Sequence, residues 1–204
     1  MSMKNKVLDF ERIMGLYFRY GVKNLTMDEV AHELGISKRT LYQQVSTKNE
    51  LVDLVLNEQF SKFRKAVSSI VDKEDGSIRK LYSVYRLIAD FFKPLTPVFV
   101  YSLNKMSSKL AEELHRKYND FIVEVFGRIV DEGEEEGIFL MRLKDDFARL
   151  VAGYLFQANE KGTVLQMAEV DLNNAFYLQT SGVCTDHGRK VLNQLMDNPK
   201  LLTA

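Results

Sequence analysis

Apolar residues recur along most of the chain at the three- and four-residue spacing that is typical of amphipathic helices. The spacing predicts helices over residues 4–20, 48–70, 77–92, 107–132 and about 145–160, with one or two more between about 165 and 197. No convincing run alternates between apolar and polar residues as a strand does, and no segment repeats. The pattern therefore predicts an all-α protein with about nine helices.

Glycine and proline residues mark where some of these helices should end. Gly21 follows the first helix, as a C-terminal stop commonly does. Pro94 and Pro97 stand close together in FFKPLTPVF, where they should separate the helix over 77–92 from the next one.

Two helix-start signatures flank a short segment near the N-terminus. Thr26 and Glu29 form the Thr-x-x-Glu pattern of a capping box, and Thr47 and Glu50 form a second one at the start of a long helix. Between them, ELGISKRTLY predicts a tight turn. Its glycine should end one short helix in the left-handed conformation, and Ser37 can cap the next helix.

The residues around Gly35 fit two short helices that cross closely. Ala31 is small enough to let the helices approach each other. Further apolar positions on the two sides of the turn are Val30, Leu34, Ile36 and Leu41. This is the pattern of a helix-turn-helix, which projects its second helix toward a major groove. Charge alone would favour an ordinary helical hairpin with a solvated basic face.

The basic charge of the chain is local. The 28 basic residues balance 28 acidic ones, so the formal net charge is zero and the chain as a whole is not a polycation. Residues 34–49, however, contain Lys38, Arg39 and Lys48 and no acid. Positive charge is thus concentrated on the second helix of the predicted motif, which suits contact with phosphates and bases at one edge.

Composition limits the class of protein and the compartment. Hydrophobic residues make up 46% of the 204 residues, which is enough for a core, so disorder is not expected. Cys184 is the only cysteine, which excludes an internal disulfide framework. The N-terminal segment lacks the pattern of a signal peptide, and no run of 18 apolar residues is present. These features predict a soluble, cytoplasmic protein.

Residues with catalytic or metal-binding chemistry are scattered. His32, His115 and His187 lack the spacing of metal ligands. The thiol and imidazole of CTDH, residues 184–187, are neighbours in sequence only, which is not a catalytic geometry. The acidic run DEGEEEG, residues 131–137, is interpreted as a solvated helix end and loop, and Gly-rich phosphate loops are absent. We therefore expect no catalytic site, no metal and no cofactor, and a protein that is not an enzyme.

The stretch GVKNLTMDEVAHELGISKRTLYQQVSTKNEL resembles the DNA-binding domain of TetR-family (TetR/AcrR-type) transcriptional regulators. The matching features are the glycine after the first helix, Thr26, the VAHELGIS turn, TLY and STKNEL, within about residues 10–55. The resemblance implies a helix-turn-helix domain over residues 1–46 and a larger helical domain over residues 47–204. A long helix from residue 48 would link the two.

The resemblance also implies which residues touch DNA. Thr26, Tyr42 and Lys48 would contact phosphates, the last with help from the dipole of its helix. Lys38 or Arg39 could reach O6 and N7 of guanine. The full expected set is Thr26, Ser37, Lys38, Arg39, Thr40, Tyr42, Gln43, Gln44 and Lys48.

The sequence departs from the family pattern at two places in or beside the second helix of the motif. Gln44-Val45 stands where the family commonly has His-Phe after the tyrosine. Arg39 stands where a small residue is frequent, which suggests a different or stronger base preference.

In the resembled family the C-terminal domain binds a small effector and forms the dimer, usually through its last two long helices, here about 145–160 and 165–197. A twofold pair would read two half-sites about 34 Å apart. An effector pocket between helices would be apolar. Its candidate lining residues are Phe92, Phe99, Tyr101, Met106, Tyr118, Phe121 and Tyr154, although ordinary core is the favoured interpretation of any single one of them.

The expected function is a homodimeric, ligand-responsive transcription regulator, a repressor that leaves a palindromic operator when an effector shifts the fourth helix. One alternative is a DNA-binding activator or architectural factor without effector control, which the absence of a cavity in the C-terminal domain would favour. The other is a helical adaptor or enzyme with a vestigial helix-turn-helix, which would tolerate Lys38→Ala and Arg39→Ala.

Overall fold

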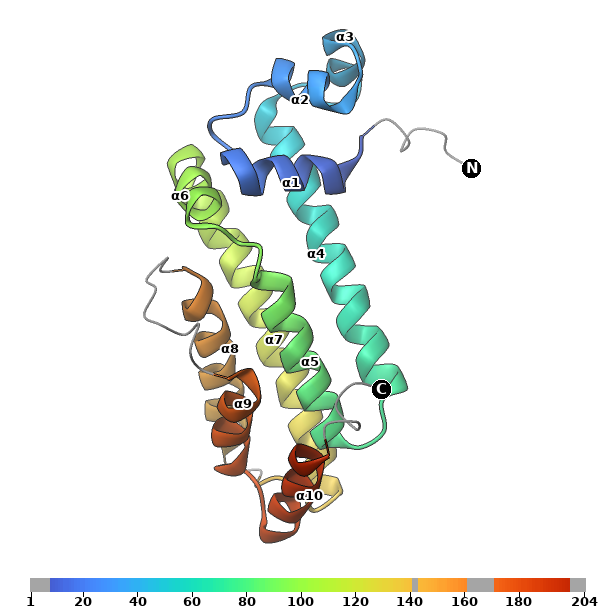
Figure 1. Ribbon diagram of the computed structural model, residues 1–204, viewed down its shortest axis with the longest axis vertical. Coiled ribbons are helices and arrows are strands. Elements are labelled where there is room, and N and C mark those ends of the chain that lie inside the picture. The colour runs from blue at the N-terminus through green and yellow to red at the C-terminus, as the bar shows by residue number, and fades with distance from the viewer. Residues whose placement is uncertain (1–7, 141–142, 161–170, 199–204) are drawn as a thin grey trace. The chain divides into compact units, whose positions relative to one another are not determined.

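The computed structural model describes residues 8–140, 143–160 and 171–198 (Figure 1). These residues form ten helices: α1 (Phe10–Tyr20), α2 (Met27–Leu34), α3 (Lys38–Tyr42), α4 (Lys48–Lys73), α5 (Ser77–Phe92), α6 (Pro97–Met106), α7 (Ser108–Glu135), α8 (Lys144–Glu160), α9 (Leu172–Ser181) and α10 (Asp186–Asp197). The all-α prediction is confirmed, with ten helices instead of about nine, because α6 is a short helix that none of the predicted ranges covered. None of the described helices combines the length and the apolar character that a membrane crossing requires.

The chain divides into two compact units, and each has its own core. The first unit comprises Met1–Arg64 and Pro94–His115, and the second comprises Lys65–Lys93 and Arg116–Ala204. α4 and α7 each contribute residues to both units. This division differs from the domain boundary expected at residue 46, which stays a prediction.

In the first unit, α1 packs on α6 although they lie far apart in sequence. α1 begins at Asp9, whose carboxylate accepts a hydrogen bond from the Arg12 N–H at 3.0 Å. It ends at Gly21 with φ 80°, which confirms the predicted stop. The predicted start at residue 4 lies outside the described residues. The core of this unit includes Ile13, Tyr17, Val30, Ala31, Leu41, Leu51, Val52, Val55, Phe99 and Leu103.

Two long-range hydrogen bonds join the end of α1 to α6. The Val22 N–H donates to the Ser102 hydroxyl at 2.7 Å, and the Thr96 hydroxyl donates to the Phe18 carbonyl at 2.8 Å. A Cβ on Gly21 would lie 2.8 Å from the Ser102 side chain, so the glycine is also needed for this close approach. α6 is therefore part of the scaffold that holds the N-terminal helices.

The two prolines separate α5 from α6 as the sequence predicts. α5 ends at Phe92, and α6 begins at Pro97. The backbone N–H that proline lacks would have no partner within the helix at this first position, so its absence costs no hydrogen bond. The Thr96 hydroxyl caps α6 by accepting a hydrogen bond from the Phe99 N–H at 3.1 Å. The same hydroxyl thus caps α6 and, by donating to Phe18, ties it to α1.

The second unit contains the acidic run 131–137, which is only partly solvated. Three of its carboxylates are paired: Asp131 with Lys144 at 2.6 Å, Glu132 with Lys80 at 2.5 Å, and Glu136 with the hydroxyl of Ser77 at 2.7 Å. These pairs join the end of α7 to the first turns of α5 and α8. Within the described ranges, no group of three potential metal ligands is found there or elsewhere.

The start of α10 is joined to the turn that follows α7 in the same unit. Thr185 donates twice, from its hydroxyl to the Gly137 carbonyl at 2.7 Å and from its N–H to the Ile138 carbonyl at 2.9 Å. The Leu140 N–H donates to the Val183 carbonyl at 2.8 Å. These bonds hold two segments that are more than 40 residues apart at backbone contact distance.

Cys184 lies in this junction and should resist chemical modification. Its side chain is 3% exposed, and burial raises the pKa of its thiol to about 11. At pH 8 only about 0.1% of such a thiol is the reactive thiolate. We expect iodoacetamide to leave the native protein unmodified at pH 8 and to label it fully after denaturation, as read from intact mass. Rapid labelling of the native protein would contradict this burial.

Candidate nucleic-acid interface

α2 begins at Thr26 with a complete capping box. The Thr26 hydroxyl accepts a hydrogen bond from the Glu29 N–H at 3.2 Å, and the Glu29 carboxylate accepts one from the Thr26 N–H at 2.7 Å. Hydrogen bonds from the backbone and then the side chain of Thr26 lower the pKa of Glu29, because they favour its charged form. The Thr26 hydroxyl is therefore already hydrogen-bonded where a phosphate contact is expected.

The turn between α2 and α3 follows the predicted geometry. Gly35 has φ 68° and ψ 28°, the left-handed conformation expected of it. Its N–H donates to the His32 carbonyl, and the Ile36 N–H donates to the Ala31 carbonyl, both at 3.0 Å. A Cβ on Gly35 would meet no atom within 4 Å, so the backbone conformation and not the space requires glycine here.

α3 is capped by Ser37, as the sequence predicts. The Thr40 N–H donates to the Ser37 hydroxyl at 3.0 Å, and the Ser37 and Thr40 hydroxyls lie 2.7 Å apart. Both hydroxyls are thus hydrogen-bonded to each other at the start of the helix. Their expected DNA contacts stay predictions and would use the remaining lone pairs or protons of this pair.

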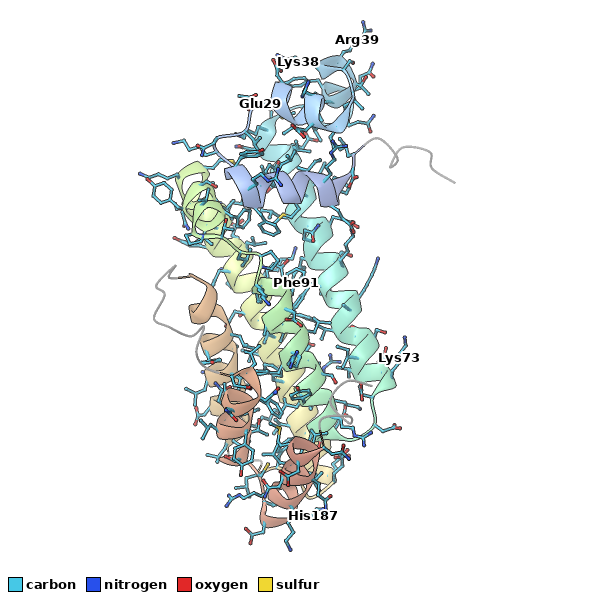
Figure 2. All side chains as sticks on the ribbon, in the orientation of Figure 1. Glu29, Lys38, Arg39, Lys73, Phe91 and His187 are labelled. Atoms are coloured by element: carbon cyan, nitrogen blue, oxygen red, sulfur yellow. The ribbon has the colours of Figure 1, made fainter. Side chains whose placement is uncertain are left out.

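Lys38 and Arg39 differ sharply in their surroundings. The Lys38 ammonium lies 2.8 and 3.0 Å from the two carboxylate oxygens of Asp28 in α2, and this hydrogen bond raises the pKa of Lys38. Arg39 is exposed and projects from the outer side of α3 (Figure 2). The Asp28 contact was not predicted, because ten residues separate the partners and no local pattern connects them.

We expect Asp28→Asn to strengthen non-specific DNA binding by releasing Lys38. One additional phosphate contact should steepen the dependence of log affinity on log salt by up to about one unit per protomer. Fluorescence anisotropy with a duplex that lacks any inverted repeat, at several salt concentrations, measures this slope. Asp53→Asn, an exposed position on α4 of the same unit, is the matched control. Equal slopes in the two variants would contradict the expected release.

The last residue of α3 and the three residues after it differ in how far they are exposed. Tyr42 is 43% exposed and Gln43 is exposed, as DNA contact requires, whereas Gln44 is half-buried. Val45 is 2% exposed and belongs to the core of the unit. The Gln44-Val45 departure from the family pattern therefore keeps an apolar side chain at the end of the motif.

Lys48 is the first residue of α4 and is held by the backbone. Its ammonium donates to the Lys23 carbonyl at 2.8 Å, and partial burial lowers its pKa. The second capping box is only partly formed. The Thr47 hydroxyl accepts from the Glu50 N–H at 3.1 Å, but the Glu50 carboxylate accepts from the Ser46 N–H at 2.6 Å, one residue before the expected position.

The seven candidate pocket residues are divided between the two units. Phe99, Tyr101 and Met106 lie on α6 in the first unit, where Phe99 is core and Tyr101 is 66% exposed. Phe92, Tyr118, Phe121 and Tyr154 lie in the second unit, where the first two are buried with ring centroids 5.4 Å apart. A pocket role for any of them stays a prediction.

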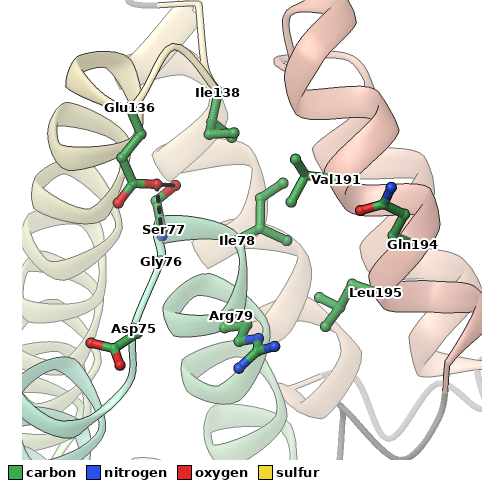
Figure 3. A pocket seen from close by; sticks show the side chains of 10 residues that line it. All are labelled: Asp75, Gly76, Ser77, Ile78, Arg79, Glu136, Ile138, Val191, Gln194 and Leu195. Carbon is green, nitrogen blue, oxygen red and sulfur yellow. Dashed lines mark hydrogen bonds between the residues drawn. The ribbon is translucent and has the colours of Figure 1, made fainter.

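A pocket of about 160 Å³ opens at the start of α5 in the second unit (Figure 3). Its apolar wall consists of Ile78, Ile138, Val191 and Leu195, and its polar lining consists of Asp75, Arg79, Glu136 and Gln194. Glu136 is hydrogen-bonded to Ser77 inside it. None of the seven predicted residues lines this pocket, because it lies at the α5–α10 junction and not among the aromatic side chains.

A family comparison agrees with this geometry. The sequence model of the family described as "Bacterial regulatory proteins, tetR family" matches residues 12–55, which span α1, α2, α3 and the start of α4. No curated protein sequence matches the chain.

Solved structures of regulators have a similar fold. A TetR-family transcriptional regulator from Marinobacter aquaeolei is 14% identical with a TM-score of 0.65, over 97% of this chain and 98% of that one. A putative fatty acid metabolism regulator of Clostridium perfringens is 21% identical with a TM-score of 0.62, over 87% and 98%. A ketosteroid transcriptional regulator of Mycobacterium tuberculosis is 17% identical with a TM-score of 0.57, over 91% and 96%. At these identities the likeness concerns the fold.

Proposed function

We propose that the chain is a DNA-binding transcription regulator of the TetR family and not an enzyme, and that it is a homodimeric repressor that a small effector releases from a palindromic operator. It would act in the cytoplasm, where its DNA target lies. The observation that carries the proposal is the capped helix-turn-helix whose second helix presents Arg39 outward. An exposed guanidinium at the start of a recognition helix suits bidentate contact with guanine.

Dimerisation would double the length of DNA that is read. α3 spans five residues, so one copy contacts too few bases for specificity, whereas two copies read half-sites about 34 Å apart. The proposed interface uses the last helices of the second unit. Leu150 on α8 is 71% exposed and Leu178 on α9 is 70% exposed, so both apolar side chains are available to a second copy.

We expect the double variant Leu150→Glu/Leu178→Glu to weaken or abolish the dimer. Burying two carboxylates per protomer in an apolar interface is costly, so the dimer dissociation constant should rise at least about a hundredfold. Analytical ultracentrifugation over a range of protein concentrations measures it. Leu54→Glu, which changes a 40% exposed leucine of the first unit, serves as the control and should stay dimeric. A monomeric wild type, or a double variant that dimerises equally well, would exclude this interface.

Effector control would act through a difference in binding between two states of the dimer. An effector in the second unit that favours the state with poorly spaced recognition helices lowers operator affinity, with a coupling free energy of typically about 1–3 kcal/mol. One of the similar proteins is named as a putative fatty acid metabolism regulator and another as a ketosteroid transcriptional regulator, which makes an apolar effector a reasonable first class to test here.

Selection of bound fragments from a genomic DNA pool at near-physiological salt tests the proposal. Recovery of an inverted repeat, lost in Lys38→Ala/Arg39→Ala, would support a dimeric sequence-specific regulator and supply a probe for effectors. Recovery of DNA without sequence preference would contradict the proposal of a specific operator and would favour an architectural role. Mass spectrometry of small molecules extracted from the protein accompanies the selection, because a bound inducer would suppress recovery.

A further inference from the structure

The pocket at the start of α5 lies within the second unit and has an apolar wall. This wall consists of three buried side chains and a half-buried one, which are Ile78, Ile138, Leu195 and, half-buried, Val191. Figure 3 shows Ile78 of α5 pointing toward Val191 and Leu195 of α10. Aliphatic side chains offer water no hydrogen bonds, so this wall favours an apolar group.

Contacts outside the pocket hold this wall in shape. The Ile138 carbonyl accepts a hydrogen bond from the Thr185 N–H at 2.9 Å. A Cβ on Gly188 would overlap the same carbonyl, so the backbone of α10 lies directly against Ile138. The pocket between α5 and α10 is therefore formed without a ligand, and a preformed site loses little conformational freedom on binding.

Glu136 contributes a carboxylate that is oriented by the protein and only half used. Its Oε2 accepts hydrogen bonds from the Ser77 N–H at 3.1 Å and from the Ser77 hydroxyl at 2.7 Å (Figure 3). Within the described residues, its Oε1 accepts no hydrogen bond. An ionised carboxylate can accept about four hydrogen bonds, so Oε1 is available to a donor in the pocket.

The charged groups around the pocket favour a cation. The lining carries two carboxylates, Asp75 and Glu136, and one guanidinium, Arg79, so negative charges outnumber positive ones. All three residues are exposed, and among the described contacts only Glu136 is fixed by side-chain hydrogen bonds. An anionic ligand would meet this fixed carboxylate, and a neutral apolar ligand would leave it without a counter-charge.

The volume of the pocket limits the size of the apolar group. In other proteins an apolar cavity of about 150 Å³ accepts a benzene ring. The volume here is about 160 Å³. The pocket therefore fits a ring or a branched chain of about six carbons.

We propose that this pocket binds a small amphipathic cation. Its ammonium group donates to Oε1 of Glu136, and its apolar group packs on Ile78, Ile138 and Leu195. An ammonium carries three donors, so those that Glu136 does not accept stay hydrated at the open side, and the charge is not fully desolvated. The proposal names a site and a ligand class for the proposed effector control, and it rests on that control only for its effect on DNA binding.

Benzylamine, benzyl alcohol and benzoate share one ring and differ in charge, so they are the probes for this pocket. Calorimetry and ligand-observed NMR on the full-length protein, at a neutral pH where the amine is protonated, measure their affinities. The variants are Glu136→Gln, Val191→Phe and Arg79→Met. Glutamine keeps an oxygen for Ser77 and removes the charge, whereas phenylalanine fills the pocket. Glu135→Gln is the matched control, because Glu135 is exposed, adjacent and outside the lining.

We expect benzylamine to bind wild type and Glu135→Gln with a dissociation constant of about 1 mM or lower, as a ligand of this size allows. Benzyl alcohol should bind more weakly, and benzoate should not bind measurably. Glu136→Gln should lower the affinity for benzylamine about five- to tenfold, since water screens an ion pair in an open pocket. Arg79→Met should raise this affinity about two- to threefold by removing a like charge. Val191→Phe should abolish binding without lowering the Tm, because the added ring occupies the pocket.

Three results would overturn the site. The first is no binding of benzylamine up to about 10 mM, and the second is benzoate binding that is as tight as that of benzylamine. The third is a benzylamine affinity that neither Glu136→Gln nor Val191→Phe changes. A lower Tm of Glu136→Gln would show that its charge also stabilises the start of α5, and Val191→Phe then decides the assignment alone.

DNA binding separates this site from the proposed repressor function. With an operator from the selection, benzylamine should weaken operator binding by wild type and leave that of Val191→Phe unchanged. Amine binding that depends on Glu136, without any operator, would refute the repressor alone, whereas an operator without amine binding would refute this site alone. Amine binding that leaves operator affinity unchanged would refute an effector role for this pocket.

Discussion

Arg39→Ala should remove most of the sequence-specific DNA affinity, whereas Lys38→Ala should remove much less. Arg39 is exposed on α3 and free to approach a base, while Lys38 is held by Asp28. A bidentate arginine–guanine contact contributes about 1–3 kcal/mol, so its loss from two half-sites costs about 2–6 kcal/mol. The operator dissociation constant should therefore rise roughly thirtyfold to twenty-thousandfold.

Electrophoretic mobility shift or anisotropy with the selected operator measures this difference. Lys73→Ala, which removes an exposed basic side chain outside the helix-turn-helix, serves as the control and should bind like wild type. Arg39→Ala should also relax base preference at one position of each half-site, whereas Lys38→Ala should weaken all sequences alike. Equal losses in the two variants would show that the Lys38–Asp28 pair opens on DNA and that both residues read bases.

Gly188→Ala should strongly destabilise the second unit. A Cβ on this residue of α10 would overlap the carbonyl oxygen of Ile138 and lie 2.9 Å from its carbonyl carbon. Both are backbone atoms of the turn that Thr185 holds, so neither can move aside as a flexible side chain would. Overpacking of this kind costs about 1–3 kcal/mol or more and outweighs the gain of about 1 kcal/mol in helix propensity.

Thermal unfolding measures the effect, and a fall in Tm of roughly 3–10 °C is expected for a chain of this size. Gly182→Ala is the matched control six residues away. Gly182 has φ −69°, which alanine adopts readily. A Cβ added to Gly182 would lie 3.8 Å from the nearest atom, the Gln179 carbonyl oxygen, so alanine fits there. Similar Tm values for the two variants would mean that α10 can move away from the turn without loss.

Much of the helical architecture could be predicted because its signals are local. Apolar residues at steps of three and four determine which face of a helix is buried, and α5 begins and ends where that spacing predicts. The capping box of Thr26 and Glu29 acts within a single turn of helix. The second box was predicted less well, because Glu50 can reach either of two adjacent N–H groups and the local chain path decides between them.

The sequence predicted that the site is a helix-turn-helix, but it did not predict the contacts within the site. The pattern around Gly35 locates the turn, and the expected DNA-facing residues of α3 are contiguous in sequence. Their availability depends on partners elsewhere, such as the Lys23 carbonyl that holds Lys48. The aromatic pocket residues stay a prediction, and the structure divides them between the two units, since aromatic spacing alone does not distinguish core in the first unit from core in the second.

The sequence by itself determined the helices, their caps and the helix-turn-helix, because these depend on interactions within a few residues. Only the tertiary structure decided which charges are neutralised. It pairs Lys38 with Asp28, leaves Arg39 exposed on α3 and ties one oxygen of Glu136 to Ser77. It also places Gly188 against the backbone of Ile138, about 50 residues earlier. Charge pairing and close packing both depend on distances between remote segments, which no local pattern records.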